Sequence, residues 1–211
     1  GVGMGSSGWM VAISARARAS RCSSCANRDA DASALPCPSA RLALSSRPAA
    51  SHIDSMIRPD SLLCPTPKGL YCPPGDFFID PVRGGVDRAV VPHGHSDHAR
   101  AGHGAVLATP ETIEAMATRY GEAFTPSRQA VRYGETTRIG EVQVTLYPAG
   151  HVIGSAQVLV EWKGLRMICT GDYKRRRDPT CAPFEVVPCD IFISEATFAL
   201  PVFRHPPADG E

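Results

Sequence analysis

The stretch "VVPHGHSDHARAGH", residues 90–103, gathers metal-binding side chains directly behind an apolar run. It contains four of the seven histidines of the 211-residue chain. Val90 and Val91 suit a buried strand, and Pro92 ends that strand because proline cannot donate to a sheet ladder. The polar side chains that follow are therefore expected on a loop at the edge of a sheet, where a rigid scaffold can aim them.

The side chains of this stretch have the chemistry of a metal site. Imidazole and carboxylate groups suit zinc and related divalent ions. The pattern His-x-His places two imidazoles on the same side of an extended segment. His93, His95, Asp97 and His98 are four donors within six residues, which is many for one tetrahedral ion. We therefore predict a two-metal site and disfavour the alternative, a solvated loop with chance histidines.

Three other segments repeat the design of a polar side chain at a strand end. Asp80 follows 77–79, His151 follows 142–147, and Asp172 follows 165–170. Taken singly each is weak, because an aspartate at a strand end is more often a turn former. Together they supply the outlying ligands that the local cluster lacks. His103 is expected to have a structural role on a short helix behind the cluster.

The hydrophobic pattern predicts a layered α/β (α+β) fold that is rich in strands. A helix is expected to begin at Thr109-Pro110-Glu111 and to end before Gly121, and a hairpin is expected to turn at Lys163-Gly164. The predicted strands cover 77–79, 88–91, 105–108, 142–147, 156–162, 165–170 and 190–194.

Residues 1–55 differ in texture from the remainder of the sequence. They are rich in alanine, serine and arginine, and neither strand nor helix periodicity is sustained. We interpret them as a disordered extension or as non-native upstream sequence, with Met56 as a natural first residue. Residues 56–211 then form the folded domain.

Composition limits the compartment and the partners. The net charge of +1 argues against bulk attraction to nucleic acid, so such contact requires a local basic patch or a bound metal. The eight cysteines are irregularly spaced without a secretory signal, which predicts reduced thiols in a cytoplasmic protein. No run approaches the roughly 18 apolar residues that a membrane helix needs, so no membrane partner is expected.

The successive motifs resemble those of a known family. Asp80, the HGHSDH run at 93–98, Gly150-His151 and Gly171-Asp172 are similar to the motifs of the metallo-β-lactamase fold. "SEATF" at 194–198 resembles the first motif of its β-CASP branch, which includes the mRNA 3′-end cleavage endonuclease, Artemis-like nucleases and bacterial RNases. Within that branch, residues 56–201 most resemble the bacterial ligase-associated DNA exonucleases.

The resemblance implies a fold and a set of site roles. The fold would be an incomplete metallo-β-lactamase-type αββα sandwich that stops at the start of the β-CASP region. Only His205 follows Glu195, so the second metal site would be incomplete and the sequence truncated at its C-terminus. The implied roles are His93, His95 and His151 on one metal, Asp97 and His98 on the second, Asp172 bridging both, Asp80 orienting a ligand imidazole, and Glu195 steadying a catalytic histidine.

The expected activity is that of a metal-dependent phosphodiester hydrolase, a DNA exonuclease in DNA repair with a DNA ligase as partner. It would use two divalent ions, Zn²⁺ with Mn²⁺ as the alternative, and Asp97 would accept a proton from water. The basic run Lys174, Arg175, Arg176 and Arg177 is either a phosphate grip or a solvated loop. Open alternatives are an RNA-processing β-CASP ribonuclease, a small-molecule lactonase or thioesterase, and an inactive fragment.

Overall fold

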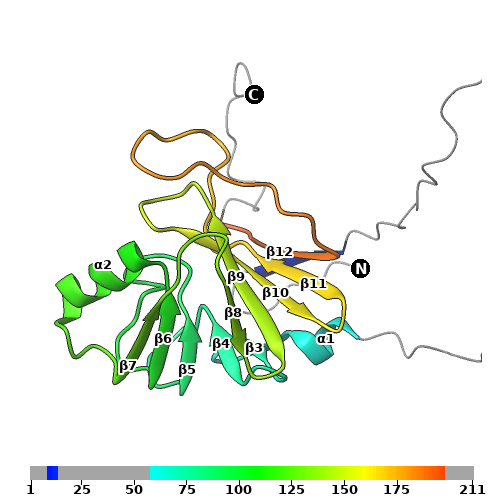
Figure 1. Cartoon of the computed structure of the whole chain (residues 1–211), viewed down its shortest axis with the longest axis horizontal. Helices are drawn as coiled ribbons and strands as arrows, with labels where there is room; N and C mark the ends of the chain where they lie inside the picture. The colour runs from blue at the N-terminus through cyan, green and yellow to red at the C-terminus, as the bar shows by residue number, and fades with distance from the viewer. Residues whose placement is uncertain (1–8, 14–57, 198–211) are drawn as a thin grey trace, which may run out of the picture. The chain divides into compact units, whose positions relative to one another are not determined.

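The computed structural model describes residues 9–13 and 58–197, which form two six-stranded sheets and two helices (Figure 1). Sheet I has the strand order β2 (Cys64–Thr66), β3 (Gly69–Cys72), β4 (Phe77–Ile79), β5 (Arg88–Val90), β6 (Ala105–Ala108) and β7 (Ser127–Ala130). Sheet II has the order β1 (Trp9–Ile13), β12 (Ile191–Glu195), β11 (Leu165–Cys169), β10 (Ala156–Trp162), β9 (Val142–Pro148) and β8 (Thr136–Ile139). The helices are α1 (Pro59–Leu62) and α2 (Pro110–Tyr120).

Sheet I changes from antiparallel to parallel pairing along its width. Strands β2, β3 and β4 pair antiparallel, whereas β4, β5, β6 and β7 pair parallel. Parallel strands bring their carboxyl ends to one edge of the sheet. Asp80, which follows β4, and the loop that follows β5 therefore emerge side by side.

In sheet II the carboxyl ends of three strands lie at one edge. Strands β8, β9, β10 and β11 pair antiparallel in sequence, and β12 runs parallel to β11. The β10–β11 hairpin turns at Lys163 and Gly164, whose φ angles of 48° and 85° suit a type I′ turn, as predicted. The carboxyl ends of β9, β11 and β12 consequently share an edge, and they lead to His151, Asp172 and Glu195.

The two sheets pack face to face around one apolar core. In β9 the alternating side chains of Val142, Val144 and Leu146 are buried toward this core, as the period-2 pattern predicted. Phe77 and Ile79 of β4 join the same buried cluster from sheet I. The core fixes the distance between the two sheets and hence between the loops at their shared edge.

Helix α2 covers the other face of sheet I. Ile113 and Met116 pack in a second buried cluster with Val91 and Val106. Thr109 caps the helix by accepting a hydrogen bond from Thr112 N at 3.3 Å, Pro110 occupies the first turn, and Gly121 ends it with a φ of 83°. The predicted helix and both of its ends are thereby confirmed.

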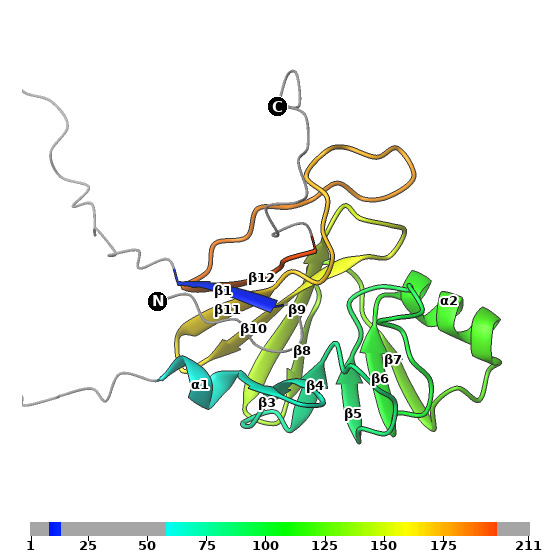
Figure 2. The same cartoon turned by 180° about the vertical axis from the view of Figure 1, so that it is seen from behind.

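The predicted fold class is confirmed, with α2, sheet I and sheet II as successive layers of an incomplete αββα sandwich. Within residues 9–13 and 58–197 no helix covers the outer face of sheet II. Figure 2 shows β1 beside β12. The register of this pair sets Trp9 opposite Glu195 and Ile13 opposite Ile191. The sequence had indicated no regular element before Met56, because the five apolar residues of β1 show no alternation; the other residues of that segment lie outside the described ones.

Several short elements escaped the sequence pattern. Each of these elements, α1, β2, β3, β7 and β8, is only three or four residues long, which is too short to show a hydrophobic period. In addition, every residue of β7 is exposed. The expected helix at His103 is wrong: this buried residue lies in an irregular segment, where its carbonyl accepts a hydrogen bond from Thr125 Oγ1. Of the helices described, none has the length and apolar character required to cross a membrane.

Candidate metal centre

The 93–98 loop is fixed where β5 ends. Val91 N donates to Leu107 O, and Pro92 O accepts from Ala156 N at 2.8 Å, so both sheets hold the start of the loop. The loop then makes a single helical turn in which Ala99 N donates to His95 O at 2.7 Å. His93 is fully buried at the base of this loop. These backbone bonds hold the segment from which the imidazoles of His93, His95 and His98 extend.

The 150–155 loop carries His151 from the end of β9. Gly150 has a φ of 72°, and a Cβ atom there would clash with Lys174 O, so only glycine fits. Ser155 Oγ accepts hydrogen bonds from His151 N at 3.0 Å and from Val152 N at 3.2 Å. These two bonds fix the tight turn that holds His151.

Asp172 reaches the same place from the end of β11. Thr170 N donates to Ile193 O at 3.0 Å, which anchors the strand end to β12. Gly171 has a φ of 56°, and a Cβ atom there would lie 2.8 Å from Pro92 Cβ. The absence of a side chain at Gly171 therefore lets the Asp172 loop lie against the start of the 93–98 loop.

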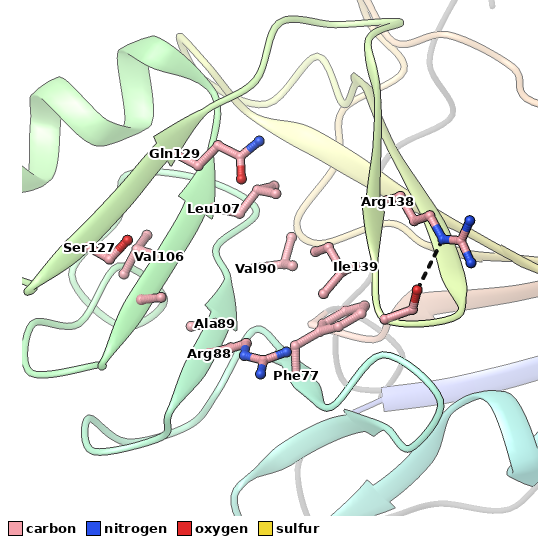
Figure 3. Close-up of a pocket in the computed structure, with 12 residues that line it drawn as sticks. Phe77, Arg88, Ala89, Val90, Val106, Leu107, Ser127, Gln129, Arg138 and Ile139 are labelled. Carbon is pink, nitrogen blue, oxygen red and sulfur yellow. Dashed lines mark hydrogen bonds between the residues drawn. The ribbon is translucent and has the colours of Figure 1, made fainter.

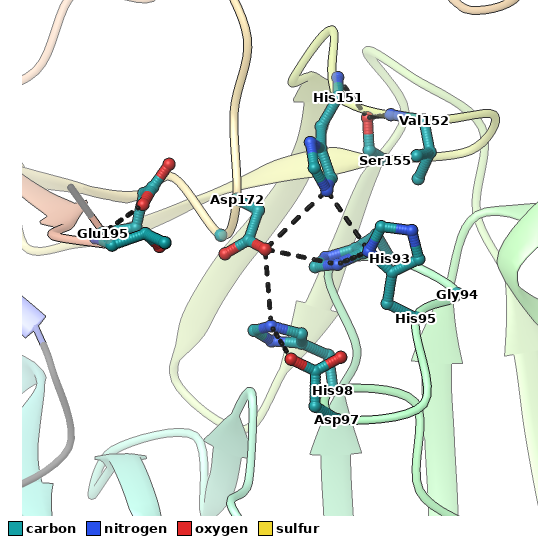
Figure 4. Close-up of polar contacts among 12 residues, drawn as sticks. His93, Gly94, His95, Asp97, His98, His151, Val152, Ser155, Asp172 and Glu195 are labelled. Atoms are coloured by element: carbon teal, nitrogen blue, oxygen red, sulfur yellow. Dashed lines mark hydrogen bonds and ion pairs between the residues drawn. The ribbon is translucent and has the colours of Figure 1, made fainter. Parts of the chain in front are cut away.

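Four side chains from the three loops converge on one point (Figure 4). His93 Nε2 lies 3.1 Å from His95 Nδ1, which lies 3.3 Å from His151 Nε2. Asp172 Oδ2 lies 3.7 Å from both His93 Nε2 and His151 Nε2. Ligand bonds of about 2.0–2.2 Å in a tetrahedron separate the ligand atoms by about 3.3–3.6 Å. The cluster therefore has the composition and the spacing to bind a divalent metal ion.

A second group of donors shares the same carboxylate oxygen. His98 Nε2 lies 3.6 Å from Asp172 Oδ2 and 3.5 Å from Asp97 Oδ2. Both oxygens of the buried Asp80 carboxylate lie 2.8 Å from His98 Nδ1, so Asp80 accepts that proton and directs Nε2 toward Asp172. Among the described residues this second position has three donor atoms, from Asp97, His98 and Asp172.

Burial sets the protonation of the cluster. It lowers the pKa of His93 to about 2, with smaller contributions from neighbouring histidines, and it also lowers the pKa of His151. Burial alone would lower the pKa of His98, but the hydrogen bond and charge of Asp80, together with Asp172, raise it. His93 and His151 are consequently neutral near pH 7, which is the form that binds a metal.

Glu195 lies beside the cluster but outside it. Its carboxylate Oε2 accepts a hydrogen bond from Thr197 N at 3.0 Å, and its own N–H donates to Thr170 Oγ1 at 3.3 Å. No hydrogen bond or ion pair joins its carboxylate to a histidine among residues 58–197, although its charge opposes the burial that lowers the pKa of His151. Its role in steadying a catalytic histidine therefore stays a prediction, and His205 lies outside the described residues.

The basic loop, residues 174–177, follows Asp172 on the exposed surface. Lys174 N donates to Ala149 O at 3.0 Å, and Lys174 Nζ pairs with Asp178 Oδ2 at 3.0 Å. Arg175, Arg176 and Arg177 are exposed and make no ion pair with any residue of 58–197.

A separate cavity of about 290 Å³ lies between sheet I and the edge strand β8 of sheet II (Figure 3). It is lined by residues of β5, β6 and β7 and by Arg138 and Ile139 of β8, and it shares no residue with the metal cluster.

The clustered side chains were predicted from the sequence, whereas Ser155, which fixes the turn that carries His151, was not. No local signal identifies that serine, because its partners are backbone groups that only the fold brings near.

Comparison with known proteins gives relatives whose names indicate that they act on nucleic acids. No family model matches the protein. It is 33% identical over 141 residues to a probable DNA ligase of Opitutus terrae, a match that covers 66% of this chain and 14% of the ligase. It is 40% identical over 78 residues to Endoribonuclease YSH1 of Gibberella zeae, covering 36% of this chain and 9% of that protein. These relatives confirm the resemblance to β-CASP nucleases of the metallo-β-lactamase fold.

Two solved structures match parts of the chain with TM-scores below 0.5. A Cronobacter sakazakii metallo-β-lactamase with an HARLDQ motif is 21% identical with a TM-score of 0.34, covering 54% of this chain and 60% of that one. Zn²⁺-bound PqqB of Methylobacterium extorquens is 16% identical with a TM-score of 0.30, covering 38% of this chain and 36% of that one. The chain spans 14% of the ligase and 9% of the endoribonuclease that it matches.

Proposed function

We propose that this protein binds two divalent metal ions at its loop cluster and hydrolyses phosphodiester bonds in nucleic acid, with DNA ends as the substrate. One observation carries the proposal: Asp172 Oδ2 lies 3.7 Å from His93 Nε2 and 3.6 Å from His98 Nε2. One carboxylate oxygen thus borders two donor sets. That is the arrangement expected of a ligand shared by two ions.

The residues of the cluster divide the work of such a site. A pair of divalent ions supplies positive charge that activates water and offsets the charge that develops on a phosphate in the transition state. His93, His95 and His151 would hold one ion, Asp97 and His98 the other, and Asp172 both. Asp97, whose side chain is 72% exposed, would also accept a proton from water.

The surroundings of the cluster suit an anionic polymer. The net charge of the protein is only +1, so attraction to phosphates must come from local groups. Arg175, Arg176 and Arg177 are exposed three to five residues after Asp172, and each phosphate that they contact would add salt-dependent affinity. Lys174 contributes less, because Asp178 already pairs with it.

The relatives favour nucleic acid over small molecules and support two substrates. The longer match, 141 residues, is to a probable DNA ligase and supports a DNA exonuclease that works with ligation in repair. The shorter matches, to YSH1 endoribonucleases, support RNA cleavage as the second candidate. We propose Zn²⁺ as the ion because the first donor set is three imidazoles and one carboxylate, with Mn²⁺ as the alternative.

An end-labelled substrate assay tests this proposal. The longest form of the protein that its gene encodes is incubated with Zn²⁺ or Mn²⁺ and with single- and double-stranded DNA or RNA of one sequence. We expect stepwise shortening of DNA that is abolished by Asp172→Asn and retained in the surface control Asp87→Asn. Cleavage of RNA alone would overturn the DNA assignment, and hydrolysis of a thioester without cleavage of either polymer would overturn the nuclease assignment.

A further inference from the structure

One face of α2 lies against both histidine loops of the cluster. Glu111, Ala115 and Arg119 recur every four residues, so they form a single stripe along the helix. Each of the three has its contact to a glycine of a ligand loop, Gly94 or Gly154. These three residues belong neither to the buried core clusters nor to the candidate metal ligands.

The contact with the 93–98 loop is at Gly94, between His93 and His95. A Cβ atom on Gly94 would lie 3.0 Å from Ala115 Cβ, so the loop backbone rests directly on the helix. Arg119 Nη2 donates a hydrogen bond of 2.7 Å to Gly94 O. A charged donor makes such a bond about twice as strong as a neutral one.

The contact with the 150–155 loop is at Gly154, near the other end of the helix. Thr109 Oγ1 donates to Gly154 O at 2.7 Å, and Thr112 Oγ1 donates to it at 3.2 Å. A Cβ atom on Gly154 would lie 2.8 Å from Glu111 Cβ. The same helix therefore holds the backbone of the loop that carries His151.

The position of Arg119 at the end of α2 does not by itself explain its bond to the 93–98 loop. An arginine in the last turn is ordinarily a favourable charge near the helix C-terminus. Here its guanidinium extends to a carbonyl of another segment, and it also lies 5.5 Å from the Tyr120 ring centroid. Arg119 is exposed, and ordering such a long side chain costs rotamer entropy, which the bond to Gly94 O must offset.

We propose that Arg119 is a positioning residue of the metal centre, which fixes the Gly94 carbonyl and thereby the 3.1 Å separation of His93 Nε2 from His95 Nδ1. Ala115 provides the seat for the same loop, and Thr109 and Thr112 fix the His151 loop to the same helix. The inference rests on the proposed metal binding. It adds α2 to the elements that fix the geometry of the cluster.

Titration with Co²⁺ tests the role of Arg119, with visible absorption bands reporting the coordination geometry and calorimetry reporting the affinity. His95→Ala/Asp172→Ala defines the background from other groups such as cysteines. We expect Arg119→Gln to weaken cluster binding about tenfold or more and to shift the bands. Arg138→Gln is the matched control, because Arg138 Nε also donates to a glycine carbonyl, Gly140 O at 3.2 Å, far from the cluster.

Two rescue variants separate positioning from general stability. Arg119→Lys keeps one donor for Gly94 O and is expected to bind Co²⁺ within about threefold of the wild type. Gly94→Ala is expected to distort the bands, and Ala115→Gly in the same protein to restore them, because the added methyl group then has room. Thermal unfolding of every variant shows which changes follow stability alone.

The outcomes distinguish this inference from the proposed function. If the wild type binds Co²⁺ no better than His95→Ala/Asp172→Ala, the metal centre itself is refuted, and the role of Arg119 falls with it. If the wild type binds but Arg119→Gln matches Arg138→Gln in affinity and spectrum, only the positioning role is refuted. A Gly94→Ala defect that Ala115→Gly leaves unchanged would likewise exclude the seat on α2.

Discussion

The 93–98 loop and the basic loop both follow a strand end, and each concentrates side chains of one chemical type. They differ in how far the fold buries and fixes these side chains. His93 is fully buried, and both sheets fix the backbone on which it stands. Arg175, Arg176 and Arg177 are exposed without ion-pair partners in residues 58–197. Metal coordination requires positions set to fractions of an ångström, whereas the capture of a phosphate polymer requires only accessible charge.

The largest effect is expected at Asp172, the carboxylate that both donor sets share. Asp172→Ala removes an oxygen within 3.7 Å of three imidazoles, so we expect the loss of both bound ions. Metal content after dialysis against Zn²⁺, measured by mass spectrometry, checks this. Retention of two ions per protein molecule by the variant would contradict a shared role for Asp172.

The next largest effect is expected at Asp80. Asp80→Asn keeps the size of the side chain and a backbone φ of 49°, which asparagine tolerates, but weakens the acceptor for His98 Nδ1. Loss of such an outer partner costs about 10–100-fold in metal affinity. Asp76→Asn is the control, since exposed Asp76 has a similar φ of 52°. Equal Zn²⁺ affinities of the two variants would exclude the orienting role.

The two donor sets are expected to lose Zn²⁺ at different pH values. The pKa of His93 is lowered to about 2 and that of His151 is also lowered, so protons compete less for these ligands than for His98, whose pKa is raised above its usual 6.5. Below that raised pKa, affinity at His98 falls about tenfold per pH unit because the ligand must be deprotonated. We expect Zn²⁺ stoichiometry to fall from two to one between pH 7.5 and pH 5. Simultaneous loss of both ions would contradict this order.

The smallest effect is expected in the basic loop. Substituting alanine for Arg175, Arg176 and Arg177 should leave Zn²⁺ affinity unchanged and weaken DNA binding. For three lost phosphate contacts, the slope of log affinity against log salt should decrease by about 2 to 3. Lys174→Ala should change that slope less, because Asp178 already neutralises Lys174. An unchanged slope in the triple variant would assign the loop to solvent.

Local patterns predicted the regular parts of the fold. The alternation of Val142, Val144 and Leu146 and the capping of α2 by Thr109 are written in adjacent residues, and the structure shows both. Strand β7, "SRQA", has no apolar side to register, and β1 is defined only by its pairing with β12. Such elements exist because of neighbours distant in the sequence, so single-sequence periodicity misses them.

The candidate site shows the same division. His93, His95 and Asp172 could be predicted because metal-binding residue types recur at strand ends, and family motifs linked the separate segments. Ser155 and Arg119 could not, because both act through hydrogen bonds with backbone groups of other residues, His151 N and Gly94 O. A serine or arginine in isolation carries no sign of such a partner. The candidate ligands could therefore be predicted from the sequence, whereas the residues that position them could be identified only from the fold.

The central claim, that loops from both sheets hold two ions through one shared carboxylate, is tested most directly by anomalous diffraction at the zinc edge from crystals grown with Zn²⁺. We expect one peak about 2.0–2.2 Å from His93 Nε2, His95 Nδ1 and His151 Nε2. A second peak should lie beside His98 Nε2 and Asp97, with Asp172 bound to both ions. Zinc peaks located only at cysteines or surface residues, with none between His151 and Asp172, would contradict the claim.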